Sequence, residues 1–210
     1  MIRRPPRSTL DRSSAASDVY KRQVLILIFS LQSWTKADDI SEFEIEGISI
    51  GDSLLDYYSD SKIQDSKMNY LEGKRNFYVV GVDDGSKLYD NIEFYLKTGD
   101  KKYLIYGISA GIFYRDNYNQ CEKKKDKIVR EIKDIFKQSK MSDWGLFSHS
   151  YDKSGLSKQT AVSFDVERGA IRIECVNWSK KITKENNWID NLSVSAISHE
   201  VTKWIERGYP

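Results

Sequence analysis

The sequence has few of the residues on which catalytic and metal sites are built. Its 210 residues include only two histidines, two cysteines and three prolines. His199 and Glu200 begin the pattern of a zinc-protease helix, but Lys203 stands where that pattern requires a second histidine. His149 lies in a polar stretch, and neither a Gly-x-Ser-x-Gly elbow nor a phosphate loop is present. We therefore predict no catalytic residue, no cofactor and no metal site.

A long apolar run is also missing. The run from Val24 to Leu31 has eight residues, whereas a membrane-spanning helix needs about 20. That length is typical of the apolar part of a signal peptide, and Thr35 and Ala37 occupy the −3 and −1 positions of a cleavage site. We expect cleavage after Ala37, a periplasmic or secreted protein, and no transmembrane segment in the mature chain. The alternative is that 24–37 includes a buried N-terminal strand.

The first 23 residues differ in composition from the rest. Met1 to Gln23 holds five arginines and two of the three prolines. Met1 to Thr9 resembles the translated flow-cell part of a sequencing-library adapter, and Ser13 to Gln23 resembles the translated transposase end. The resemblance implies that 1–23 is an adapter-derived artefact and not native protein. We then expect 24–37 to be the remnant of a signal peptide and 38–210 to be a single domain.

The charge of the chain excludes one class of partner. Residues 38–210 carry 26 basic and 29 acidic side chains, a net charge of −3. The densest basic run, Glu122 to Lys127, is expected to be the solvated face of a helix. Because nucleic-acid binding needs clustered positive charge, we predict no nucleic-acid partner.

Periodicity places strands in pairs and helices between them. Apolar alternation predicts strands over 76–82, 92–97, 102–114, 160–166, 170–177 and 192–196. Helical spacing predicts a long helix over 119–140, a last helix that Ser198 caps and Gly208 ends, and short helices over 52–58 and 59–67. We expect 179–187 to be a loop. This order predicts an α+β fold in which antiparallel β-hairpins pack against two or three helices.

The two cysteines are expected to form a disulfide. Cys121 lies on the apolar side of the predicted long helix, and Cys175 lies on the apolar side of a predicted strand. An even number of cysteines in an exported chain favours a bond, which would staple the helix to the sheet. The alternative is two buried thiols.

Aromatic residues are the remaining compositional signal. Trp178 and Trp188 flank the polar stretch 179–187, and Trp144 lies upstream of them. Aromatic side chains beside lysine and asparagine are typical of faces that bind sugars or proteins, so these three tryptophans are candidate binding residues. The alternative is that they anchor the core.

One stretch carries a family resemblance. Asp39 to Asp56 (DISEFEIEGISIGDSLLD) resembles the opening of a family of uncharacterised exported proteins predicted from marine bacteria, and Lys181 to Glu185 fits the same resemblance. It implies export but no activity. We expect a non-enzymatic periplasmic or secreted module that binds an envelope protein or a saccharide. The alternatives are a small secreted hydrolase using scattered acids or His149, and a purely structural envelope protein.

Overall fold

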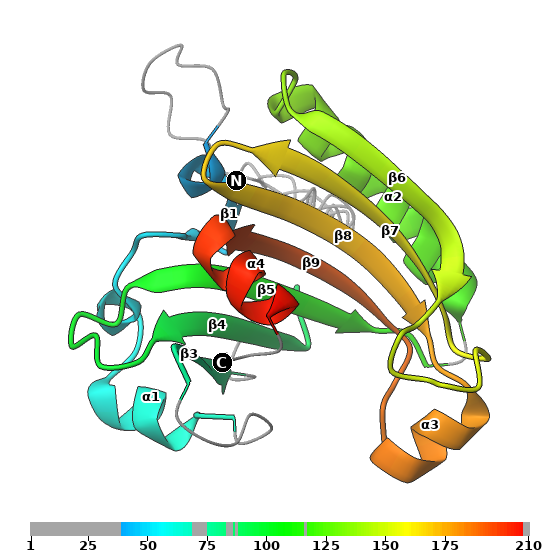
Figure 1. The fold of residues 1–210 in the computed structure, drawn as a ribbon, viewed down its shortest axis with the longest axis horizontal. Coiled ribbons are helices and arrows are strands. Elements are labelled where there is room, and N and C mark those ends of the chain that lie inside the picture. The colour runs from blue at the N-terminus through cyan, green and yellow to red at the C-terminus, as the bar shows by residue number, and fades with distance from the viewer. Residues whose placement is uncertain (1–38, 69–74, 83–85, 87, 116, 208–210) are drawn as a thin grey trace, which may run out of the picture. The chain divides into compact units, whose positions relative to one another are not determined.

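A seven-stranded antiparallel sheet dominates the part of the chain that the computed structural model describes, residues 39–68, 75–82, 86, 88–115 and 117–207 (Figure 1). Its strands are β3 (Phe77–Val82), β4 (Asn91–Lys97), β5 (Ile105–Phe113), β6 (Lys140–Ser148), β7 (Lys158–Val166), β8 (Gly169–Asn177) and β9 (Asn191–Ser198). They follow the order β3-β4-β5-β9-β8-β7-β6. The predicted adapter segment, signal remnant and cleavage site lie outside the described residues.

Short elements precede the sheet and helices cover it. The remaining elements are η2 (Ile40–Glu42), β1 (Glu44–Ile45), β2 (Ile48–Ser49), η3 (Leu54–Asp56), α1 (Asp60–Asp65), α2 (Tyr118–Ile135), α3 (Lys180–Asn186) and α4 (His199–Glu206). Serine hydroxyls cap α1, α3 and α4 by accepting a backbone N–H of the first turn, from Ser59, Ser179 and Ser198. Among the described helices, none combines the length and apolar character that crossing a membrane requires.

The sheet buries apolar side chains on both faces because successive residues of a strand point to opposite sides. On one face β8 presents Ile171, Ile173 and Cys175 to the main core, against which α2 packs. On the other face Phe77 of β3 packs with Trp204 of α4, with ring centroids 5.5 Å apart. Figure 1 shows α4 in front of the sheet. The sheet is therefore a middle layer where α2 and α4 cover it.

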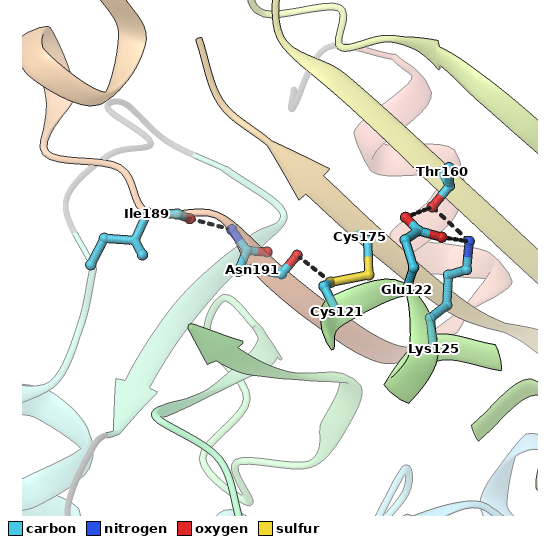
Figure 2. The surroundings of a disulfide bond; sticks show 7 residues. All are labelled: Cys121, Glu122, Lys125, Thr160, Cys175, Ile189 and Asn191. Carbon is cyan, nitrogen blue, oxygen red and sulfur yellow. Dashed lines mark hydrogen bonds and ion pairs between the residues drawn. A yellow bond between two sulfur atoms is a disulfide. The ribbon is translucent and has the colours of Figure 1, made fainter. Parts of the chain in front are cut away.

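A disulfide joins α2 to β8 (Figure 2). Cys121 and Cys175 are fully buried, with Cα atoms 6.0 Å apart. The Sγ atom of Cys121 also lies 3.3 Å from the carbonyl oxygen of Asn191, the first residue of β9. A disulfide sulfur has no proton to donate, so this last approach is a packing contact. The bond holds the first turn of α2 against β8, near the end of that strand.

A buried polar cluster lies one turn further along α2 (Figure 2). The Lys125 Nζ donates to Glu122 Oε2 at 2.7 Å and to the Thr160 hydroxyl of β7 at 2.6 Å, and that hydroxyl donates to Glu122 Oε1 at 2.7 Å. Burial raises the pKa of Glu122, but the hydrogen bonds it accepts, of which the one from Lys125 has the largest effect, outweigh burial. The pKa of Glu122 is therefore below its ordinary value. The prediction that the run from Glu122 to Lys127 faces solvent is thus wrong for Lys125, which is buried and whose ammonium group donates two hydrogen bonds within the cluster.

The antiparallel sheet and its hairpins agree with the expectation from the sequence, with three differences. The described residues hold four α-helices and not two or three. The long helix ends at Ile135, so the strand β6 occupies 140–148, where no strand was predicted. The predicted loop over 179–187 is wrong, because Ser179 caps the helix α3 there and Asn187 ends it in the left-handed conformation, φ 57°.

Candidate functional site

Four aromatic rings contact one another in a row. They belong to segments in or next to the β6–β7 loop and α3, which lie at one end of the sheet (Figure 1). His149 and Tyr151 come from the loop after β6, Trp178 follows β8, and Trp188 follows α3. The centroid distances along the row are 4.4 Å from His149 to Trp178, 4.6 Å from Trp178 to Trp188, and 4.5 Å from Trp188 to Tyr151. Neighbouring rings are tilted by 48–56°. Each ring is therefore tilted against the next and not stacked parallel to it.

These rings line a cavity of about 430 Å³, which we call the aromatic cavity. Phe113 of β5 and Ile189 add apolar surface, and the amide side chains of Asn187 and Asn191 add polar groups. The rings are accessible, since Tyr151 is 50% exposed and Phe113 40%. The volume and lining of this cavity are typical of small-molecule sites, which usually measure about 300–1,000 Å³ and have mostly apolar walls with a few polar groups.

The Asp152 carboxylate shapes the loop that carries His149 and Tyr151. It is buried and accepts four hydrogen bonds, from the hydroxyl and backbone N–H of Ser154 and from those of Ser157, at 2.6–3.0 Å. The hydrogen bonds from Ser154 and then Ser157 hold the pKa of Asp152 well below its ordinary value. The loop is thus built around a permanently ionised carboxylate.

Two further hydrogen bonds tie this loop to the tryptophans. The Ser157 hydroxyl accepts from the backbone N–H of Ser179 at 2.9 Å, next to Trp178. The Asp190 carboxylate accepts from the backbone N–H of Trp178 at 2.8 Å and so joins the two ends of the segment that contains α3. These hydrogen bonds hold the walls of the cavity in place without a ligand. Binding would therefore cost little free energy for ordering the loops.

The imidazole ring of His149 is held by its own loop. Its Nδ1 accepts the backbone N–H of Tyr151 at 3.2 Å, so in the neutral ring the proton is on Nε2. Burial lowers the pKa of His149, and Arg172 lowers it further, against the opposing charges of Glu174 and Asp152. With its lone pair engaged, the ring is poorly suited to act as a general base.

A second cavity, of about 520 Å³, shares the walls Trp178, Trp188 and Ile189 with the first. Arg115 after β5 and two lysines of α3, Lys180 and Lys184, line it. We call it the basic cavity.

The other residues singled out from the sequence lie elsewhere. Trp144 is 59% exposed on β6, where its Nε1 donates to the Ser163 hydroxyl and Arg172 lies 6.0 Å from its ring. It lines neither cavity. His199 is exposed at the start of α4. The structure thus joins Trp178 and Trp188 but leaves Trp144 apart from them, and within the described residues no three His, Cys, Asp or Glu side chains form a metal-binding group.

Sequence reasoning missed the residues that complete the site. It gave no role to Tyr151, Phe113 or Asp152, which come from distant elements. A usable local signal existed for Asp152, because an Asp followed two residues later by Ser is typical of a carboxylate-centred turn.

No family model, no curated protein and no solved structure matches this chain, so the function has to be inferred from the site itself.

Proposed function

We propose that the protein is a non-enzymatic binding module, periplasmic or secreted, that holds a saccharide ring in the aromatic cavity. The single observation that carries the proposal is the row of four rings along an open, preorganised cavity. The C–H-rich face of a sugar ring packs well on indole and phenol faces, while its hydroxyls need polar partners nearby.

Those polar partners are present. Asn187 is exposed at the rim, and Asn191 uses one amide proton to hold the carbonyl of Ile189 at 2.9 Å, which leaves its amide oxygen to accept. In the neutral ring of His149 the Nε2–H is a donor, because Nδ1 accepts from Tyr151. A few fixed donors and acceptors among aromatic walls suit a ligand that has both apolar faces and hydroxyl groups.

The cavity chemistry argues against the hydrolase alternative. None of the described residues that line the aromatic cavity is an aspartate or glutamate. A carboxylate of raised pKa does exist, because burial raises the pKa of Glu93 on β4, but Glu93 lines neither cavity. General acid–base hydrolysis needs such a group within hydrogen-bond reach of the substrate.

The test is a binding screen of the mature chain against neutral and charged oligosaccharides, followed by calorimetry. Trp188→Ala is expected to weaken binding at least tenfold, because it removes the ring between Trp178 and Tyr151. Trp144→Ala is the matched control and should bind as the parent does. Circular dichroism confirms that each variant is folded.

A different result would favour a purely structural role. If no oligosaccharide binds, and Trp188→Ala lowers only the free energy of unfolding, the four rings are a satellite core that anchors the loop. Export is tested separately, by expressing the chain with a complete signal peptide and measuring the mass of the periplasmic product, which is expected to begin at Asp38.

A further inference from the structure

The basic cavity adjoins the aromatic cavity. Trp178, Trp188 and Ile189 line both, so a ligand seated on the indoles can extend from one cavity into the other. The two cavities therefore form one continuous candidate surface, apolar in one part and charged in the other.

Positive charge is concentrated in the second part. Arg115, Lys180 and Lys184 line it, and within the described residues none of the three makes an ion pair. The lysines lie one helical turn apart on α3 and are exposed. The only acidic residue among the described lining residues is Asp190, whose carboxylate already accepts the backbone N–H of Trp178.

This local charge contrasts with the rest of the domain. Residues 38–210 have a net charge of −3, whereas three cationic side chains that make no ion pair with any described residue line this one cavity. Exposed like charges held close together repel each other, and a bound anion relieves that repulsion.

We infer that the ligand is an acidic oligosaccharide, carrying a carboxylate or sulfate group. One sugar ring lies in the aromatic cavity and the anionic group of a neighbouring unit lies in the basic cavity. The guanidinium of Arg115 presents a planar fork of donors that fits either oxyanion, and the two lysines add charge without fixed geometry. This inference rests on the saccharide-binding function proposed above and names the class of ligand.

The test compares three oligosaccharides of equal length by calorimetry: a neutral cello-oligosaccharide, an oligogalacturonate and a sulfated galactan oligosaccharide. At low salt, at least one of the two acidic ligands is expected to bind about tenfold more tightly than the neutral one. Each exposed charge contact is worth roughly two- to fivefold in affinity, and the advantage should shrink in 0.5 M salt. The acidic ligand that binds more tightly then shows whether the basic cavity prefers a carboxylate or a sulfate group.

The variant Lys180→Gln/Lys184→Gln is expected to reduce the acidic preference about fivefold, since Arg115 remains, and to leave neutral binding unchanged. The control Lys181→Gln/Lys203→Gln removes the same charge from exposed positions that do not line the cavity, and it should keep the preference.

Two results would overturn the inference in different ways. Equal affinity for neutral and acidic ligands, with binding still lost in Trp188→Ala, refutes the acidic ligand but keeps the saccharide site. A preference that survives in Lys180→Gln/Lys184→Gln places the anion elsewhere. If none of the three ligands binds, the inference fails together with the proposed function.

Discussion

Removing the bond between Cys121 and Cys175 is expected to lower the free energy of unfolding by about 4 kcal/mol. The two residues are 54 positions apart, and cross-linking a loop of that length removes about 14 cal/mol/K from the entropy of the unfolded chain. The contribution is large because a domain of this size is stabilised by only about 5–15 kcal/mol in total.

The assay is urea unfolding of the oxidised protein, of the same protein under dithiothreitol, and of Cys121→Ala/Cys175→Ala. With a slope of about 2 kcal/mol per molar urea, the midpoint should fall by about 2 M on reduction. The urea midpoint of Cys121→Ala/Cys175→Ala should fall slightly further, because both sulfur atoms are fully buried and their packing contacts are lost. Thiol titration of the denatured oxidised protein should detect no free thiol.

A loss below about 1 kcal/mol on reduction would refute this reasoning. It would mean either that the unfolded chain is already compact around this loop or that the buried bond is strained in the folded state. An intermediate result can be resolved by the alanine pair, which removes the cross-link without leaving two thiols to be accommodated.

Three further predictions concern single residues. The hydrogen bonds from Arg168 lower the pKa of Asp39 to about 2, so the stability they add is present above pH 4 and is lost as the pH falls toward 2. The variant Asp39→Asn should lower the free energy of unfolding at pH 7 by about 1 kcal/mol after allowance for solvent screening. An unchanged urea midpoint would contradict this. Gly169→Ala should cost about 1–3 kcal/mol in urea unfolding, because its Cβ would lie 2.4 Å from the side chain of Ile40 and 2.5 Å from a backbone oxygen; a variant as stable as the parent would show that the sheet yields there. Because burial lowers the pKa of His149 below 6.5, its contribution to stability is present above that pH and lost on acidification, so the melting temperature of His149→Gln should fall less than that of the parent between pH 7.5 and 5.5.

Most of the fold was predictable because most of its strands are half-buried. In β4 the buried Ile92, Phe94 and Leu96 alternate with more exposed residues, which is the pattern that period-two reasoning detects. The strand β6 gives no such signal. It is one of the two edge strands, most of its side chains are exposed, and the pairing register shifts between Asp143 and Leu146. Its extended form depends on pairing with β7, which a local pattern does not contain.

The site was predictable only in part, for a related reason. Trp178 and Trp188 are separated by ten positions and could be paired from their spacing around α3. The partners Phe113 and Tyr151 come from β5 and from the β6–β7 loop, and only the insertion of β9 next to β5 brings these elements to one end of the sheet. Trp144 was grouped with the other tryptophans by composition, which carries no information about distance.

The position of β9 has a consequence for how the chain is made. The strand next to the C-terminal helix pairs with β5 on one side and with β8 on the other, so it joins β3-β4-β5 to β8-β7-β6. Until β9 leaves the ribosome, the two halves have no strand between them and the central sheet stays open. Closure of the sheet therefore waits for β9, which follows every other strand in the described part of the chain. For the same reason, a stop codon before Asn191 would remove β9 and α4 and would leave β3-β4-β5 and β8-β7-β6 as two half-sheets with unpaired edges, which are prone to aggregate.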